Sequence, residues 1–373
     1  MKIGIMSMQR VSNYGSFLQA LGLKNTLEEI GHEVQFVDYH VGEVYGVKGN
    51  KFKNYIYKKI IRLNLYLKSK FLIMADNEKD KLFCEFLFNY EKKYLSLLNI
   101  SKKKKYFCNE DILLIGSDEV FNCLQNNIDV GYSLDLFGKN CNTNKVISYA
   151  GSFGNTTYLK IKNYKIEEEL TECFKNFTAI SVRDNNSYNI LKSLGFKNVY
   201  QHLDPVLVSD FSKYNIDNVK IRDYIIVYAY SKRIREEEAE IIKKFAKKYN
   251  KKLICIGGVQ DFCDEFIGCS PLEILAYFKH ADYIITDTFH GSIFSIKNGK
   301  QFVSIIRTSE KGAYGNEEKL KDLLEKLKLS ERNIVDINNL EELLLTPIDY
   351  LETFSIIEKE RNRTLEYLRE YIK

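Results

Sequence analysis

The chain has 373 residues and a formal net charge of +5, with 45% hydrophobic and 28% charged residues. This length exceeds what one hydrophobic core usually serves, so we expect two domains, and the composition argues against wholesale disorder. The mild positive charge disfavours a nucleic-acid partner, which would require a more concentrated basic surface.

The cysteines and the first residues indicate a cytoplasmic protein. The eight cysteines form no Cys-x-x-Cys motif and no Cys/His cluster at zinc spacing, so we expect small buried side chains and no metal site. The opening stretch "MKIGIMSMQRVSNYG" lacks the long apolar core of a signal peptide. No apolar run approaches the ~18 residues of a membrane span.

Short apolar runs alternate with amphipathic helical patterns along the whole chain. In the first half, strands are predicted at 2–8, 33–39, 111–116, 146–150 and 178–182, and helices at 17–31 and 183–195. In the second half, strands are predicted at 224–230, 252–258 and 283–286, and helices at 231–249, 270–280 and 349–373.

This alternation predicts an α/β fold with parallel sheets covered by helices, because nearly continuous apolar strands are buried on both faces. A polar stretch at 209–223 separates the two series. We therefore predict two Rossmann-like domains, residues 1–212 and 219–348, that face a central cleft. The C-terminal helix, 349–373, is expected to pack back on the N-terminal domain.

One segment departs from the alternation. Residues 44–75 contain eight Lys or Arg and no Asp or Glu, with apolar and tyrosine side chains at roughly helical spacing. One interpretation is a basic amphipathic helix that contacts anionic lipid or a lipid-linked substrate at the inner face of the membrane. The other is a helical insertion that packs on its own domain and exposes a solvated basic face.

Polar clusters directly follow four of the predicted strands. They occupy positions 12–16, 116–119, 183–184 and 287–292. In open α/β sheets, ligands bind outside the carboxyl ends of the strands, so these clusters are expected to gather at one edge.

His290 lies just past a strand end and at the start of a predicted helix, where backbone N–H groups and the helix dipole attract anions. Thr288, Gly291 and Ser292 suit a small anionic group such as phosphate or carboxylate. An imidazole there can donate to that group and act as a general acid. The alternative is a structural histidine that is hydrogen-bonded and inert.

The other clusters also allow two interpretations. Arg183 ends an apolar run and presents a fork for carboxylate or phosphate, whereas Asp184 suits a surface ion pair or a helix cap. Asp118 and Glu119 follow a buried strand, where one carboxylate can act as a base toward a sugar hydroxyl or cap the next helix. Asp204 forms a turn with the next proline and is also a candidate to face the cleft.

The 12–16 cluster contains neither a Walker A motif nor a GxGxxG fingerprint, so it gives little reason to propose a nucleotide. Ser12 or Asn13 is an expected N-cap, and Gly15 allows a ligand to approach the backbone closely.

In six stretches that appear in the same order, the chain resembles the polysaccharide pyruvyl transferase family. They are "NYGSFLQALGLKNTLEEIGHEV", "IGSDEVFN", "ISYAGSFG", "ISVRD", "LDPVL" and "ADYIITDTFHGSIFSI". The resemblance implies a fold similar to GT-B glycosyltransferases. It also implies transfer of pyruvate from phosphoenolpyruvate to two hydroxyls of a sugar, with no cofactor besides that donor. The acceptor would be a glycan, a nucleotide sugar or a lipid-linked sugar.

The family's histidine in "FHG" matches His290 and its arginine in "SVRD" matches Arg183, so both are expected to hold phosphoenolpyruvate. The catalytic candidates are His290, Arg183 and Asp118. The substrate-binding candidates are Thr288, Phe289, Gly291, Ser292, Asn13, Tyr14, Gly15, Ser16, Glu119, Asp184 and Arg307.

The chain departs from the family pattern at two places. Phe121 stands where the family often has Trp, which would alter stacking on a sugar. An arginine common after the Gly-Asn at 315–316 is absent, because Glu317, Glu318 and Lys319 follow instead. Arg307 or Lys311 is then expected to supply that charge.

Two other functions remain open from the sequence. A GT-B glycosyltransferase that uses a nucleotide-sugar donor would have the same fold. Its second domain would need a carboxylate to recognise the nucleotide, for which Asp261, Asp264 and Glu265 are candidates. A non-catalytic glycan-binding or assembly protein on the same fold is the other alternative.

Overall fold

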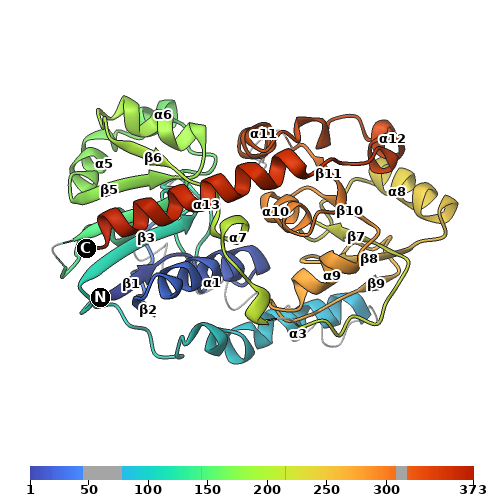
Figure 1. Cartoon of the computed structure of the whole chain (residues 1–373), viewed down its shortest axis with the longest axis horizontal. Helices are drawn as coiled ribbons and strands as arrows, with labels where there is room; N and C mark the ends of the chain where they lie inside the picture. The colour runs from blue at the N-terminus through green and yellow to red at the C-terminus, as the bar shows by residue number, and fades with distance from the viewer. Residues whose placement is uncertain (45–77, 144, 215, 308–316) are drawn as a thin grey trace.

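The strands form two separate six-stranded sheets, each in its own half of the chain, in a computed structural model that describes residues 1–44, 78–143, 145–214, 216–307 and 317–373 (Figure 1). The first sheet has the order β2 (Glu33–Phe36), β1 (Lys2–Met6), β3 (Ile112–Asp118), β4 (Val146–Gly151), β5 (Phe177–Val182), β6 (Val199–Gln201). The second has the order β12 (Asn333–Ile334), β11 (Gln301–Ile305), β10 (Tyr283–Thr286), β7 (Tyr224–Tyr228), β8 (Lys252–Ile256), β9 (Glu265–Phe266).

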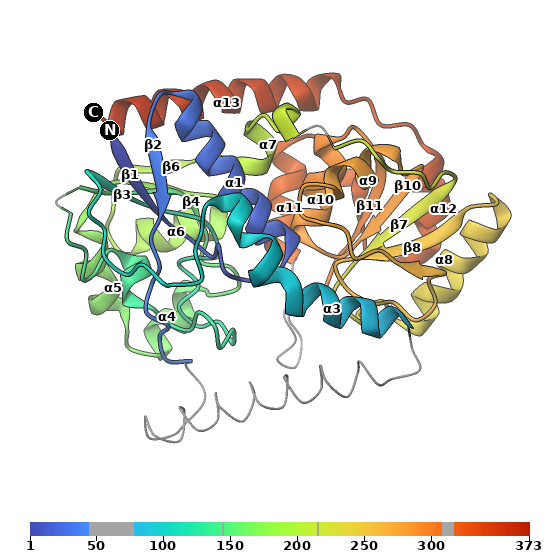
Figure 2. The same ribbon diagram turned by 90° about the horizontal axis from the view of Figure 1, so that it is seen from below.

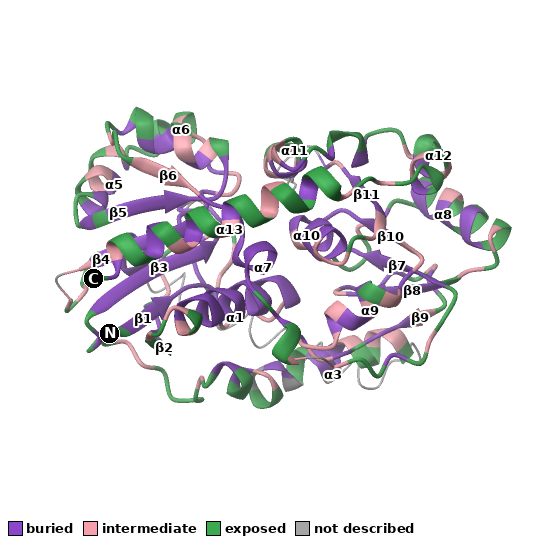
Figure 3. Cartoon of the chain, in the orientation of Figure 1, coloured by how far each residue is buried: buried purple, intermediate pink, exposed green. Residues whose placement is uncertain are grey.

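Neighbouring strands run parallel throughout both sheets. The predicted α/β class with two Rossmann-like domains is therefore confirmed. The central strands are buried on both faces, as their apolar sequences predict, and Figure 3 shows them enclosed by helices in both domains. Except for Val44, the basic segment 44–75 lies outside the described residues.

The helices cover these sheets. The helices of the first half of the chain are α1 (Tyr14–Glu29), α3 (Glu78–Lys93), α4 (Tyr158–Asn163), α5 (Glu167–Phe174), α6 (Asn185–Ser193) and α7 (Pro205–Val208). Later in the chain follow α8 (Glu236–Lys248), α9 (Ile274–His280), α10 (Phe289–Lys297), α11 (Glu317–Lys326), α12 (Leu340–Leu345) and α13 (Leu351–Tyr371). Within the part of the chain that the structure describes, no helix is long and apolar enough to cross a bilayer.

The N-terminal boundary of α8 differs from the sequence prediction. The helix begins at Glu236, so residues 231–235 form a loop that leads away from β7. Three glutamates occupy the first turn, and the Glu238 carboxylate accepts the backbone N–H of Arg235 at 2.8 Å. Negative charge at this position stabilises a helix N-terminus, which accounts for the later start.

The C-terminal helix α13 runs from the second domain across to the first, where the two chain ends lie close together (Figures 1 and 2). The hydroxyl of Tyr367 donates to the carbonyl of Ser148 in β4 at 2.7 Å, and the hydroxyls of Tyr149 and Thr364 lie 3.1 Å apart. Buried polar contacts of this kind attach the helix to the first sheet in a defined register.

His202 is a buried core residue between this helix and the sheet. Its ring stacks on Tyr149 with centroids 5.5 Å apart, and the centroid of Tyr367 lies 4.7 Å away. The ring nitrogen Nδ1 lies 2.7 Å from the hydroxyl of Ser181. Burial lowers the pKa of His202 to about 3, and the charge of Arg363 acts in the same direction.

We predict that His202 makes the protein sensitive to acid. An unfolded histidine titrates near pH ~6.5, so the unfolded chain binds a proton here at pH values where the folded chain does not. The free energy of unfolding should therefore fall as the pH drops from ~6.5 toward the folded pKa. In His202→Gln this decline should be shallower by about 1.4 kcal/mol per pH unit. Urea unfolding at several pH values measures the slope, and equal slopes would contradict the prediction.

Candidate active site

Polar residues from both domains line a cavity of about 390 Å³. The first domain contributes the N-terminus of α1, the loop after β3 and Arg183 after β5. The second contributes the loops after β7 and β10 and Lys319 on α11. The sequence-predicted residues that the structure brings together here are Asn13, Tyr14, Gly15, Ser16, Asp118, Glu119, Arg183, Thr288, Phe289 and His290.

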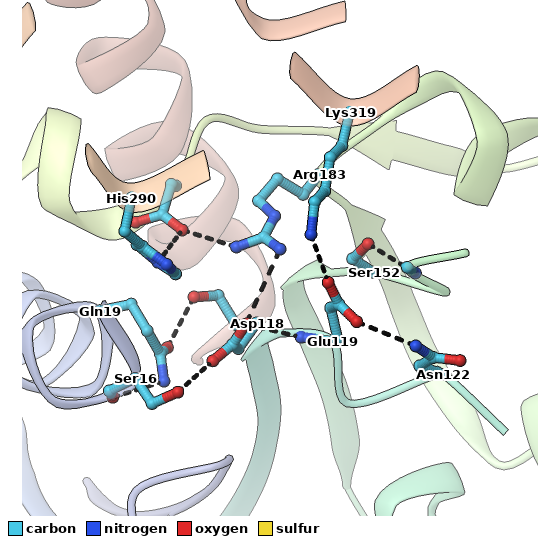
Figure 4. A network of polar contacts seen from close by, with 12 residues as sticks. Ser16, Gln19, Asp118, Glu119, Asn122, Ser152, Arg183, His290 and Lys319 are labelled. Carbon is cyan, nitrogen blue, oxygen red and sulfur yellow. Dashed lines mark hydrogen bonds and ion pairs between the residues drawn. The ribbon is translucent and has the colours of Figure 1, made fainter. Parts of the chain in front are cut away.

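Arg183 is the most deeply buried cation of the cavity. Its side chain is 3% exposed, and Nη1 donates to Oδ2 of Asp204 at 2.7 Å (Figure 4). Nη2 lies 3.8 Å from Oδ1 of Asp118, and the guanidinium lies 4.3 Å from the ring centroid of Phe289. Burial opposes the charge, but Asp204 and Asp118 outweigh it and raise the pKa of Arg183. Because Phe289 begins α10, this stack joins the two domains through a cation–π contact.

His290 reaches the same carboxylate from the other domain. Its Nε2 is buried and lies 3.5 Å from Oδ2 of Asp204, with no closer hydrogen-bond partner among the described residues. Burial alone would raise the pKa of Asp204. The contacts with His290 and Arg183 have the opposite and larger effect, so the pKa of Asp204 lies below its usual value. One buried carboxylate is thus shared by an arginine and a histidine from opposite walls of the cavity.

Gly15 makes this position of His290 possible. A Cβ at residue 15 would lie 2.2 Å from Nδ1 of His290, closer than any side chain can tolerate. Gly15 stands in the first turn of α1, after Asn13, whose side chain accepts the backbone N–H of Ser16 at 2.7 Å. Of the two predicted N-caps, Ser12 and Asn13, the structure shows Asn13 in this role. The ring of His290 packs directly on the backbone of this helix.

Asp118 ends β3 in a backbone conformation that is unfavourable for a side chain, with φ at +76°. Its Oδ2 accepts from the hydroxyl of Ser16 at 2.7 Å, and its Oδ1 accepts from the backbone N–H of Glu119 at 2.9 Å. Strained residues of this kind cluster at functional sites, where surrounding contacts hold them.

Glu119 and Lys319 connect the two domains beside Arg183 (Figure 4). Nζ of Lys319 lies 2.7 Å from Oε1 of Glu119, and Asn122 donates to the other carboxylate oxygen at 2.9 Å. In many members of the family an arginine follows the Gly-Asn at 315–316. In this chain Lys319 lies in that stretch and places its charge in the cavity. Lys311 lies outside the described residues.

Gly291 and Ser292 lie within α10 and do not line the cavity. The N–H of Gly291 donates to Oγ1 of Thr288 at 2.9 Å, and the N–H of Ser292 donates to the carbonyl of Thr288 at 3.3 Å. Thr288 therefore caps both amides that were expected to hold an anion. Within the described chain, the N–H groups of Phe289 and His290 make no hydrogen bond, so these two remain for a ligand.

Asp184 takes the capping role that was one of its two interpretations. It accepts the backbone N–H of Ser187 at 2.8 Å at the start of α6. Its side chain lines a neighbouring cavity of about 370 Å³ instead of the first one.

Arg307 also lies outside the lining of the first cavity. Both terminal nitrogens donate to the Glu238 carboxylate, at 2.5 and 2.8 Å, and its Nε donates to Asp287 at 3.2 Å. These buried ion pairs occupy the guanidinium.

Phe121 cannot stack on a sugar in this structure. It is fully buried, with its ring centroid 4.9 Å from that of Phe174 and 5.5 Å from that of Phe137. The prediction that Phe121 alters stacking on a sugar is therefore wrong, because this residue belongs to the core of the first domain.

The site residues predicted from the sequence did not include Arg233, Asp287 and Lys319, which line the cavity, although Asp287 belongs to the 287–292 cluster. Asp204, which was considered only as a candidate to face the cleft, lines the neighbouring cavity. Arg233 was assigned to a helix, although it lies in the loop between β7 and α8. Among the described residues, no group of three or more His, Cys, Asp or Glu side chains is arranged to hold a metal ion.

Comparisons with known proteins agree with this architecture. The family model described as "Polysaccharide pyruvyl transferase" matches residues 13–309. No curated protein sequence matches the chain significantly.

Solved structures show the same fold at low identity. MnaA from S. aureus, solved with UDP, has a TM-score of 0.53 at 12% identity, over 100% of this chain and 96% of that chain. The UDP-GlcNAc 2-epimerase from Neisseria meningitidis has a TM-score of 0.52 at 12% identity, over 99% and 100%. That from Methanocaldococcus jannaschii has a TM-score of 0.51 at 12% identity, also over 99% and 100%.

Proposed function

Because the chain belongs to the polysaccharide pyruvyl transferase family, we propose that it transfers pyruvate from phosphoenolpyruvate to two hydroxyls of a sugar. The products are a cyclic ketal on the sugar and inorganic phosphate. The observation that carries this proposal is the convergence of Arg183 and His290, from opposite domains, on the buried carboxylate of Asp204.

This arrangement suits a small donor with several negative charges. The N–H groups of Phe289 and His290 stand at the N-terminus of α10, where the helix dipole favours a phosphate. Arg183 lies against Phe289 at the same helix end, and its Nε has no hydrogen-bond partner among the described residues. The guanidinium therefore keeps a donor for an anion next to these amides.

In the proposed reaction, a proton adds to the methylene carbon of phosphoenolpyruvate and C2 becomes electrophilic. One sugar hydroxyl attacks C2 and loses its proton. The second hydroxyl then attacks C2 as the bond between C2 and the phosphate oxygen breaks, and its proton passes to the departing phosphate. This step closes the ring and releases phosphate. His290 and Arg183 stabilise the charge that develops on the departing phosphate.

Asp118 is the proposed base for the attacking hydroxyl. The two hydrogen bonds from Ser16 and Glu119 fix its carboxylate at the cavity wall, so it can meet an acceptor without rearrangement. We propose a glycan or its nucleotide-sugar or lipid-linked precursor as the acceptor, because the family acts on polysaccharides.

Carbon-labelled donor tests the reaction directly. With phosphoenolpyruvate labelled at C2 and a panel of sugars, nucleotide sugars and lipid-linked sugars, NMR should show a quaternary ketal carbon. Phosphate should appear in equal amount. Consumption of a nucleotide sugar while phosphoenolpyruvate stays intact would instead support the glycosyltransferase alternative. Asp261, Asp264 and Glu265 do not line either cavity, so a nucleotide would need other partners.

A further inference from the structure

Five amide side chains line the cavity from two loops of the first domain. They are Asn122, Gln125, Asn126 and Asn127 in the loop after β3, and Asn155 in the loop after β4. We call this set the amide wall. Each amide carries no charge and offers both a hydrogen-bond donor and an acceptor. A hydroxyl group likewise donates and accepts, so this surface suits a molecule with several hydroxyls.

The amide wall adjoins the charged residues of the cavity at Glu119. Oε1 of Glu119 lies 2.7 Å from Nζ of Lys319, and Oε2 accepts from Nδ2 of Asn122 at 2.9 Å, so this carboxylate stands between a cation and the amides (Figure 4). The same Nδ2 of Asn122 lies 3.4 Å from Oδ1 of Asn155. Asp118, the proposed base, accepts the backbone N–H of Glu119. A sugar hydroxyl that meets Asp118 is therefore next to the amide wall.

Hydrogen bonds hold the two loops of the amide wall together. Asn122 is buried, and its Oδ1 accepts from the hydroxyl of Thr156 at 2.8 Å. The same hydroxyl accepts the backbone N–H of Leu124 at 3.3 Å. Asn186 donates to the carbonyls of Gly154 and Thr156 at 3.2 and 2.9 Å. The wall is thus formed before a ligand arrives, which lowers the cost of ordering it on binding.

Three side chains of the amide wall keep hydrogen-bonding groups for a ligand. Within the part of the chain that the structure describes, Nδ2 of Asn155, Nδ2 of Asn127 and the side-chain amide of Asn126 make no hydrogen bond. Oδ1 of Asn127 accepts the backbone N–H of Asp129 at 3.0 Å, which orients that side chain. The nearby ammonium of Lys160 donates to the carbonyl of Asn155 at 2.9 Å, but Lys160 is exposed and does not line the cavity.

We propose that Asn126, Asn127 and Asn155 bind hydroxyls of the acceptor sugar that do not react, and so select among sugars. This inference rests on the proposed function, because an acceptor is needed only if pyruvate is transferred. Asp118 then lies between the two substrates, with the anionic donor on the cationic side of the cavity and the uncharged sugar ring on the amide wall. A site that hydrogen-bonds a hydroxyl discriminates against a sugar that lacks it, because its polar groups are left without a partner.

Ketal formation from methyl glycosides of glucose, galactose, mannose and N-acetylglucosamine, and from the corresponding UDP- and GDP-sugars, tests the inference. For each probe that the wild type converts, Asn155→Ala should raise the KM of the sugar about tenfold, as for loss of a neutral hydrogen bond. The dissociation constant of phosphoenolpyruvate, measured by calorimetry, should not change. Asn163→Ala is the matched control, because Asn163 ends α4, is exposed and lines neither cavity.

Monodeoxy forms of the converted glycoside show whether the contact is direct. One of them should have the same KM with Asn155→Ala as with the wild type, because the hydroxyl that Asn155 binds is already absent. An unchanged sugar KM in the alanine variants of Asn126, Asn127 and Asn155 overturns the inference, and so does weaker binding of phosphoenolpyruvate alone. If Asn155→Ala does not fold, Asn155→Asp keeps the oxygen that faces Asn122, lacks the donor, and must still raise the sugar KM. A wild-type protein that forms no ketal from any probe contradicts the proposed function itself.

Discussion

Replacement of Arg183 by glutamine should lower kcat/KM for phosphoenolpyruvate about a thousandfold. The substitution removes the charge that faces the departing phosphate, and loss of one preorganised electrostatic contact typically costs 10²–10³ in rate. It also leaves Asp204, which is fully buried, without the partner that lies 2.7 Å away. Breaking a buried ion pair costs about 3–5 kcal/mol of stability, so denaturant unfolding must accompany the kinetics.

Two further variants separate the effect on catalysis from the effect on stability. Arg183→Lys keeps the charge near Asp204 but loses the fork, so it should be more stable than Arg183→Gln and still be strongly impaired. Arg222→Gln is the matched surface control, because that guanidinium donates to the backbone carbonyl of Ile221 at 2.8 Å. Full activity of a folded Arg183→Gln protein would exclude Arg183 from the site.

Replacement of Gly15 by alanine should lower activity about a hundredfold while the protein remains stable. The new Cβ would lie 2.2 Å from Nδ1 of His290, so the imidazole must move away from Asp204. Misplacement of a catalytic group by about 1 Å can cost 10²-fold in rate. Alanine is favoured over glycine inside a helix by about 0.5–1 kcal/mol, so the loss of activity should not arise from unfolding.

Gly268→Ala provides the control for this prediction. Its Cβ would have Phe266 as nearest neighbour at 3.5 Å, an ordinary contact, so activity and stability should stay near the wild-type values. Steady-state kinetics and thermal unfolding of both variants distinguish the outcomes. An active Gly15→Ala protein would mean that the observed position of His290 is not needed for turnover.

The strands and the edge of the sheets that holds the site were predictable because both depend on local sequence patterns. Nearly continuous apolar runs such as 112–115 and 224–228 are buried on both faces, and the polar residues after β3, β5 and β10 follow from chain order alone.

The contacts that assemble the site were not predictable, because they join residues that are distant in sequence. Asp204 meets Arg183 from 21 positions away and His290 from the other domain. Nothing in the local pattern around Asp204 distinguishes a turn residue from the carboxylate on which Arg183 and His290 converge. The same holds for Lys319, which reaches Glu119 across 200 positions.

Arg307 and Phe121 show a second limit. Each was singled out by residue type and by its place in a family pattern, but the structure places both away from the cavity lining. Arg307 is held by Glu238 and Asp287, and Phe121 is enclosed by other phenylalanines. Charge or aromaticity near a motif does not indicate which way the side chain points.

The most direct test of the proposed donor site is calorimetric titration with phosphoenolpyruvate and a panel of nucleotide sugars. It requires no knowledge of the acceptor, and the same titrations are repeated on His290→Ala and Arg183→Ala. We predict that phosphoenolpyruvate binds the wild type, that both substitutions weaken it, and that nucleotide sugars do not compete at this site. Binding of a nucleotide sugar that depends on His290 and Arg183, with no binding of phosphoenolpyruvate, would contradict the account.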